Sequence, residues 1–205
     1  MGTLKGKDIL HGNQFSKKDI DAVMKTAAQM EKELKRKSSL NLLKGKILVT
    51  LFYEPSTRTR LSFEAAMQRL GGGVISMGSV EGSSVAKGET LRDTAQTVAQ
   101  YADVIVIRHP RIGSAKEVAD AVSIPVINAG DGAGQHPTQA LLDFYTIRKE
   151  LGTLKNLSIT LVGDLKNGRT VHALVEVLSH FGVHFYLVAP SLLRMPGEII
   201  ERMKE

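Results

Sequence analysis

The chain has 205 residues, of which 42% are hydrophobic and 23% charged, proportions typical of a folded globular protein and not of a disordered one. Its net charge of +6 is compatible with nucleic acid, with anionic metabolites or with no specific partner, but the chain has no basic patch interleaved with aromatic residues, which argues against nucleic acid. It has no cysteine, no apolar run long enough to cross a bilayer and no signal-peptide core, so we expect a cytoplasmic protein without membrane contact, disulfides or thiolate metal sites.

A first helix is predicted to begin at Ser16, because Asp19 three residues later can complete a capping box. Apolar residues then recur at helical spacing, at Ile20, Val23, Met24, Ala27, Met30 and Leu34. Lysines and acids share the rest of this segment, which is typical of a solvated face.

Strands and helices then alternate as far as residue 150. The predicted strands are 47–53, 74–77, 104–108 and 126–129, and the predicted helices are 61–70, 91–102, 115–122 and 137–150. Continuous β-branched runs between helices predict a parallel sheet that is buried on both faces, and therefore an α/β fold with helices flanking the sheet.

A second α/β unit is predicted from residue 151 onward. Strands at 158–162 and 184–188 enclose a helix at 169–181, and another helical pattern follows Pro196. One such unit buries too little apolar area to be stable alone, so we expect this second domain to be incomplete. The predicted organisation is a first domain at 1–136, a linking helix at 137–150 and the beginning of a second domain at 151–205.

The most informative stretch is Ser56-Thr57-Arg58-Thr59-Arg60, between a predicted strand and the next helix. The first N–H groups of a helix lack intrahelical partners and the helix dipole makes this end positive, so the stretch suits an anion such as phosphate. The alternative is an ordinary N-cap at Ser56 or Thr57 with solvated arginines. Two arginines in the first turn argue against it, because cations are unfavourable at a positive helix end.

Other polar candidates follow neighbouring strands, where open α/β sheets bind ligands. Arg108 ends one strand, and His136 and Gln139 stand at the start of the helix after the next strand. A lone histidine is more often a satisfied core or surface residue, but here its place beside the anion site favours a role with a ligand. The loop 82–90 could reach an anion through Lys87, or it could be a solvated loop.

The loop from Gly163 to Gly168 lacks the glycine spacing of a dinucleotide site, so NAD is not expected. Arg169 opens the next helix, again a position where a cation needs an anionic partner. Histidines and carboxylates are scattered along the chain, so no metal site is predicted.

Five of these motifs together resemble the catalytic chain of the aspartate carbamoyltransferase family, in order and at the family's spacing. They are Ser56–Arg60, Lys87–Glu89, Arg108–Pro110, His136–Gln139 and Gly163–His172. The first and fourth are shared with ornithine carbamoyltransferase, whereas the Lys87 loop and the last run point to the aspartate enzyme. The resemblance implies a carbamoyl-phosphate domain followed by part of an aspartate domain, and no cofactor.

The resemblance also implies a role for each matched residue. Four would bind the phosphate of carbamoyl phosphate: Ser56, Thr57, Arg58 and Thr59. Thr59, Arg108 and His136 would polarise the carbamoyl carbonyl, and Gln139 would hold the carbamoyl NH₂. Arg169 would bind a carboxylate of L-aspartate.

Lys87 and Ser83, or Ser84 beside it, would reach these ligands from a neighbouring subunit of a homotrimer. The implied reaction transfers the carbamoyl group to the amine of L-aspartate, giving N-carbamoyl-L-aspartate and phosphate, an early step of pyrimidine biosynthesis. The alternatives are ornithine carbamoyltransferase and a non-catalytic, phosphate-binding trimer module. Regulatory chains are possible, but this sequence does not reveal them.

Overall fold

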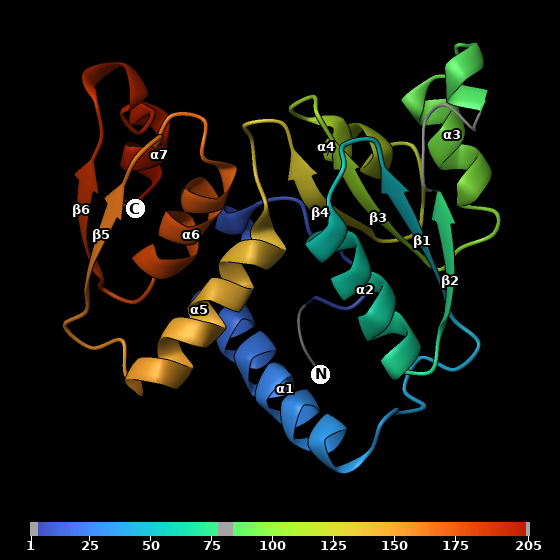
Figure 1. The fold of residues 1–205 in the computed structure, drawn as a ribbon, viewed down its shortest axis with the longest axis horizontal. Coiled ribbons are helices and arrows are strands. Elements are labelled where there is room, and N and C mark those ends of the chain that lie inside the picture. Colours follow the sequence, from blue (N-terminus) through green and yellow to red (C-terminus); the bar gives the residue numbers. More distant parts are fainter. Residues whose placement is uncertain (1–3, 78–83, 204–205) are drawn as a thin grey trace.

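The computed structural model describes residues 4–77 and 84–203, which form two parallel sheets with helices packed against them (Figure 1). Within these residues the larger sheet has the order β2-β1-β3-β4, and its strands are β1 (Ile47–Phe52), β2 (Gly73–Met77), β3 (Val104–His109) and β4 (Val126–Asp131). The smaller sheet pairs β5 (Ser158–Val162) with β6 (His184–Val188). All these strand pairs are parallel, so the predicted α/β fold is confirmed.

Helices cover both faces of the larger sheet. They are α2 (Thr57–Arg69), α3 (Leu91–Val98) and α4 (Ser114–Ala119). Alternate side chains of a strand point to opposite faces. Leu48 and Phe52 of β1 therefore pack with Met67 of α2, whereas Val49 and Leu51 pack on the other face with the small residues of α3 and α4. This two-sided burial explains why the strands are nearly continuous apolar runs.

Strand β4 continues to Asp131, two residues beyond the predicted end at Ala129. The ladder with β3 shifts its register after Ile107, and His109 then pairs with Asp131. The Asn128 side chain supports this extension, because its Oδ1 accepts a hydrogen bond of 2.8 Å from the Gly130 N–H. The polar end of β4 is consequently held in the sheet and not in a free loop.

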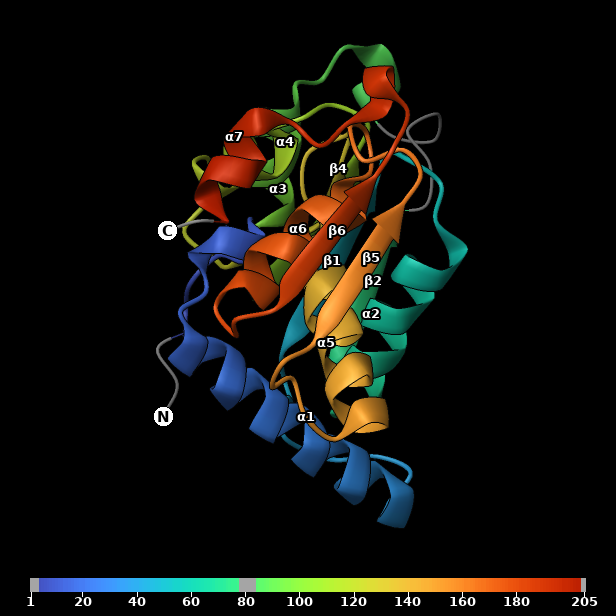
Figure 2. The same ribbon diagram turned by 90° about the vertical axis from the view of Figure 1, so that its left-hand side faces the viewer.

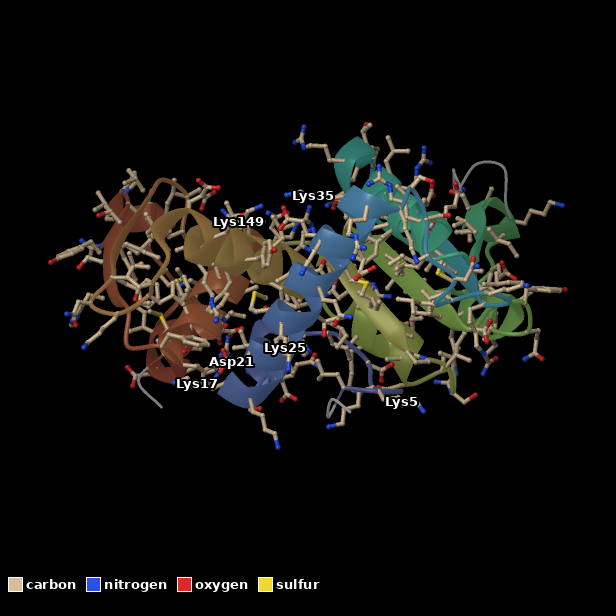
Figure 3. The ribbon with its side chains drawn as sticks, turned by 90° about the horizontal axis from the view of Figure 1, so that it is seen from below. Lys5, Lys17, Asp21, Lys25, Lys35 and Lys149 are labelled. Atoms are coloured by element: carbon tan, nitrogen blue, oxygen red, sulfur yellow. The ribbon has the colours of Figure 1, made fainter. Side chains whose placement is uncertain are left out.

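Helix α1 (Lys17–Arg36) begins where the sequence predicts. The Ser16 Oγ accepts a hydrogen bond from the Asp19 N–H, and the Asp19 carboxylate accepts one from the Ser16 N–H, which completes the capping box. Figure 3 shows Lys17, Lys25 and Lys35 along this helix. They are exposed, as expected for a solvated face.

Helix α5 (Pro137–Leu151) lies between the two sheets, next to α1 (Figure 1). One core joins α1, α5 and α6 (Arg169–Ser179), with Ile20, Phe144 and Val177 buried together. At the rim of this core Glu31 bridges Lys35 and Lys149 at 3.1 and 2.6 Å. The smaller sheet is thereby attached to the first half of the chain through packed helices, and the division into domains stays a prediction.

In the described residues, helices cover one face of the smaller sheet only. Helix α6 lies behind β5 and β6 in Figure 2, and α7 (Gly197–Arg202) packs against α6. The inward residues Leu161 and Leu187 contact this layer, whereas Val162 and Tyr186 on the other face are 73% and 60% exposed.

Among the helices of the described residues, none combines the length and the apolar character that a membrane-spanning segment requires.

Candidate functional site

A cleft of about 800 Å³ lies at the carboxyl ends of the larger sheet's strands. The N-termini of three helices, α2, α5 and α6, meet around it. Eight of the ten residues that the sequence singles out line it, namely Ser56, Thr57, Arg58, Thr59, Arg108, His136, Gln139 and Arg169. These residues span more than a hundred positions of sequence, and the parallel sheet brings them together because its strands end at one edge.

The anion site predicted at the start of α2 forms one wall of this cleft. The backbone of Ser56 is extended, and its side chain makes no capping hydrogen bond to the helix. The first turn carries no acidic residue, and Arg58 is exposed to the cleft. The hydroxyl, the helix N–H groups and the guanidinium are therefore available to one anion, which disfavours the ordinary N-cap alternative.

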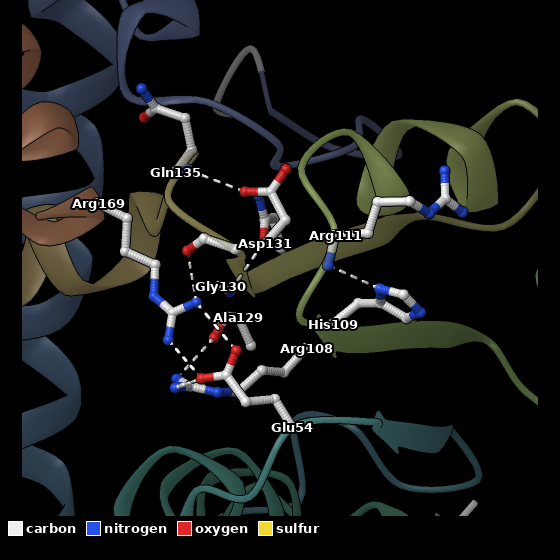
Figure 4. Close-up of polar contacts among 11 residues, drawn as sticks. Glu54, Arg108, His109, Arg111, Ala129, Gly130, Asp131, Gln135 and Arg169 are labelled. Carbon is white, nitrogen blue, oxygen red and sulfur yellow. Dashed lines mark hydrogen bonds and ion pairs between the residues drawn. The ribbon is translucent and has the colours of Figure 1, made fainter. Parts of the chain in front are cut away.

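Glu54 connects two of the arginines that line the cleft, Arg108 and Arg169, as Figure 4 shows. Its carboxylate oxygens lie 2.6 and 3.3 Å from the guanidinium nitrogens of Arg169, and it also forms an ion pair with Arg108. The arginine side chains are only 12% and 16% exposed. Hydrogen bonding by Arg169, and secondarily by Arg108, lowers the pKa of the Glu54 carboxyl against the opposing effect of burial.

Glu54 is not among the residues predicted from the sequence to line the site. Its position could have indicated it, because Glu54 directly follows the predicted strand at 47–53, two residues before Ser56. Its partner Arg169 is 115 residues away, however, so sequence spacing gives no indication of the pair. The single carboxylate of Glu54 pairs with two guanidinium groups, so this part of the cleft keeps an excess positive charge.

The backbone at the end of β4, together with the loop after it, holds both arginines in place. The Arg169 guanidinium donates to the Gly132 carbonyl at 2.7 Å, and Arg108 donates to the Ala129 carbonyl at 3.4 Å. Gly130 has φ of +119°, and a Cβ at this position would lie 3.2 Å from the Arg169 guanidinium. A residue without a side chain is thus required here, both by its backbone conformation and by the approach of Arg169.

Asp131 fixes the same loop from behind (Figure 4). Its side chain is 3% exposed and accepts hydrogen bonds from the backbone N–H groups of Gln135 and Gly113 at 2.8 and 2.9 Å. The Asn128 amide adds a third bond at 3.0 Å. These contacts set the path of the chain into α5, and therefore the position of His136.

His136 is buried, with 4% of its surface exposed. Burial lowers the pKa of its imidazole to about 4, and the charges of Arg108 and Arg169 act in the same direction. The ring is therefore neutral at neutral pH. Its Nδ1 lies 3.4 Å from the Thr138 hydroxyl. A neutral imidazole can hydrogen-bond a polarised carbonyl without adding a charge to the site.

The other two predicted residues are Lys87 and Ser83. Lys87 lies in a short 3₁₀ turn, Ser84–Lys87, where it is exposed and does not line the cleft of its own chain. Ser83 falls outside the described residues. Within residues 4–77 and 84–203, no group of three potential metal-binding side chains occurs.

Comparison with known proteins gives consistent matches. A family model described as "Aspartate/ornithine carbamoyltransferase, carbamoyl-P binding domain" matches residues 7–149. The aspartate carbamoyltransferase catalytic subunit of Thermococcus kodakarensis is 57% identical over 98% of this chain and 65% of its own length. The multifunctional protein pyr1-3 of Dictyostelium discoideum is 53% identical over 99% of this chain and 9% of its own length.

Among solved structures, aspartate transcarbamoylase from Trypanosoma cruzi in complex with carbamoyl phosphate and aspartate superimposes with a TM-score of 0.95. It is 48% identical, and the match covers 99% of this chain and 64% of that one. The chain thus spans about 65% of the length of the curated relatives it matches. Because the family model covers well over half of the sequence and these relatives match nearly all of it, the chain belongs to the aspartate/ornithine carbamoyltransferase family, among the aspartate carbamoyltransferases.

Proposed function

We propose that this chain binds carbamoyl phosphate and transfers its carbamoyl group to the amine of L-aspartate, a step of pyrimidine biosynthesis. The product is N-carbamoyl-L-aspartate, and phosphate leaves. The observation that carries the proposal is the cleft itself, which brings a helix N-terminus with Arg58 together with Arg108, Arg169 and a neutral, buried His136. Relatives named for this activity support it, although this chain spans about 65% of their length.

The phosphate of carbamoyl phosphate suits the start of α2. The hydroxyls of Ser56, Thr57 and Thr59, the free N–H groups of the first turn and the Arg58 guanidinium all offer donors, and phosphate offers only acceptors at neutral pH. Each charge-assisted hydrogen bond contributes about 1.5–3 kcal/mol, more than the helix dipole, so Arg58 supplies most of the affinity.

The carbamoyl carbonyl then lies toward Arg108 and His136. The aspartate amine attacks the carbonyl carbon and forms the new C–N bond, and negative charge develops on the carbonyl oxygen. Arg108 stabilises this charge together with the hydrogen bond of neutral His136 and the Thr59 hydroxyl. The C–O bond to phosphate breaks as the intermediate collapses, and the departing phosphate accepts the proton of the amine.

Arg169 would bind a carboxylate of the second substrate. It lines the cleft and shares the single carboxylate of Glu54 with Arg108, so two cations face one internal anion, which supports the binding of a further carboxylate here. A dianionic amino acid beside carbamoyl phosphate requires cationic surroundings, which Arg58, Arg108 and Arg169 provide against the single carboxylate of Glu54. This charge balance also favours aspartate over ornithine, which has one carboxylate fewer.

We further propose a cytoplasmic homotrimer in which Lys87, together with Ser83 or Ser84, completes the site of a neighbouring subunit. The support is that Lys87 is exposed and does not line the cleft of its own chain. A chain with Lys87→Ala mixed with one carrying Arg58→Ala should regain part of the activity, because some mixed interfaces unite both intact side chains. No recovery after mixing, with exchange verified by native mass spectrometry, would contradict a shared site.

The direct test of the proposed function is titration of the purified chain with carbamoyl phosphate in a calorimeter, followed by product assays with L-aspartate and with L-ornithine. Binding of carbamoyl phosphate with carbamoylation of aspartate alone supports the proposal. Carbamoylation of ornithine instead would assign the chain to the other branch of the family. Tight binding without turnover would favour the non-catalytic trimer module, and absence of binding would refute the proposed substrate.

A further inference from the structure

Gln139 is paired with a second side chain on the same helix. Asp143 follows it by four residues, one turn further along α5, so both side chains share a face. The Gln139 Nε2 donates a hydrogen bond of 2.9 Å to the Asp143 Oδ1. Asp143 is partly buried and does not line the cleft, whereas Gln139 lines it beside Arg108 and His136.

This contact determines the orientation of the Gln139 amide. An ionised carboxylate only accepts hydrogen bonds, so the NH₂ side of the amide must face Asp143 and the carbonyl oxygen must point away from it. In the described part of the chain, the Gln139 Oε1 accepts no hydrogen bond from another residue. The amide therefore presents an acceptor to a ligand in the cleft.

We propose that Asp143 is a positioning residue that fixes the Gln139 amide and thereby sets the specificity of the cleft for the acyl group of its acyl phosphate. An acceptor at this point favours an acyl substituent that donates a hydrogen bond. The carbamoyl NH₂ does so, whereas the methyl group of the nearly isosteric acetyl phosphate cannot. The inference rests on the proposed function, because it concerns the acyl phosphate bound there.

A purely structural role of the pair makes a different prediction. If Asp143 only stabilised α5, its loss would weaken the binding of carbamoyl phosphate and acetyl phosphate alike. If it orients Gln139, its loss should weaken the binding of carbamoyl phosphate alone, because acetyl phosphate makes no hydrogen bond to the amide oxygen. The dissociation constant of acetyl phosphate divided by that of carbamoyl phosphate separates these cases, because only the second role lowers this ratio.

The experiment measures this ratio by calorimetry on the purified chain, with carbamoyl phosphate and acetyl phosphate as probes. For Asp143→Ala we expect the ratio to fall by about tenfold, the value of one hydrogen bond, with the affinity for acetyl phosphate nearly unchanged. The matched control is Thr146→Ala, which removes another side-chain bond on α5, from the exposed Thr146 hydroxyl to the Leu142 carbonyl. It should leave the ratio as in the parent chain.

Asp143→Asn serves as a second variant, should Asp143→Ala fail to fold. An asparagine keeps the shape but can donate as well as accept, so it no longer dictates the orientation of the Gln139 amide, and we expect the ratio to fall by about threefold. A ratio within twofold of the parent value in the folded variant would overturn the proposal. Measurements on the parent chain separate a failure of the proposed function from a failure of this inference. If the parent chain does not bind carbamoyl phosphate, both are refuted. If it binds carbamoyl phosphate but does not discriminate against acetyl phosphate, the inference alone is refuted.

Discussion

The cleft of the larger sheet and the open face of the smaller sheet place opposite demands on their side chains. At the cleft, the charged groups of Glu54, Arg108 and Arg169 are largely withdrawn from water and depend on one another through ion pairs. On the open face, apolar side chains such as Val162 and Tyr186 are exposed to water. The cleft therefore responds strongly to a lost charge, and the open face tolerates substitution.

The difference also shows how the fold uses its parallel strands. Buried strands such as β1 and β3 have helices on both faces, and their carboxyl ends carry the polar residues. Strands β5 and β6 have the same pairing, but only their inward residues contact a helix in the described structure. Parallel sheets are usually covered on both sides. The face that carries Val162 and Tyr186 departs from this pattern in the described residues.

The largest effect is expected at the anion site. Arg58→Ala should leave the fold intact, because the side chain is exposed, but weaken carbamoyl phosphate binding by at least about 3 kcal/mol, since a charge-assisted contact is lost in a confined site. Calorimetry measures this change. The control is Arg60→Ala, whose guanidinium points to Glu64 at 4.0 Å and does not line the cleft. Nearly unchanged affinity in a folded Arg58 variant would contradict the assignment.

The burial of His136 should be visible in the pH dependence of folding. Its pKa of about 4 lies below the ordinary value of 6.5. As the pH falls from 6.5 toward 4, the unfolded chain takes up a proton that the folded chain does not, so the free energy of unfolding decreases, by up to about 3 kcal/mol. Above pH 6.5 both states are neutral and the contribution is constant.

Urea unfolding of the parent chain and of His136→Gln between pH 7 and 4.5 tests this prediction. Glutamine does not titrate, so the variant should lose less stability over this range. NMR titration of the imidazole provides an independent value for the pKa. An identical pH dependence in the two proteins, or a ring that titrates near 6.5, would refute the neutral, buried histidine.

A smaller effect is expected from Glu54→Gln. The variant removes the charge that pairs with Arg108 and Arg169, and we expect unfolding by urea at pH 7 to require about 2 kcal/mol less. The lowered pKa of Glu54 means that its contribution is present above its unfolded value of 4.5 and disappears as the pH falls through the lower folded value.

The matched control for this charge is Glu117→Gln. Glu117 pairs with Arg111 at 2.5 Å, but the Arg111 side chain is 56% exposed, whereas the arginine partners of Glu54 are withdrawn from water, so the loss of Glu117 should cost no more than about 0.5 kcal/mol. Equal costs for the two variants would mean that the Glu54 pairs are as weak as an ordinary surface ion pair.

The smallest effect is expected on the open face. Val162→Thr should change the stability by less than about 0.5 kcal/mol, because the side chain is 73% exposed. The same substitution at Val106, which is fully buried in β3, places a hydroxyl in an apolar core and should cost about 2 kcal/mol. Chemical unfolding of both variants measures the contrast. A large loss at Val162 would show that this face is already covered in solution, for instance by a second copy of the chain.

The amino-acid sequence determined the elements and predicted an anion site, because both are encoded locally. Alternation of β-branched runs with helical patterns specified the parallel sheet, and the residues Ser56 to Arg60 at a strand-to-helix junction predicted where an anion would bind. The parallel order of strands also implied that Arg108 and His136 would lie near this site, since strand ends share one edge.

Only the tertiary structure decided which charges pair and which groups are withdrawn from water. Glu54 meets Arg169 across 115 residues of sequence, and Gly130 leaves space for that guanidinium. The neutrality of His136 likewise depends on its burial and on the arginines around it. Coulombic and desolvation energies depend on distances in space, whereas a sequence records only distances along the chain. The local elements could therefore be predicted from the sequence, and the electrostatics of the cleft could not.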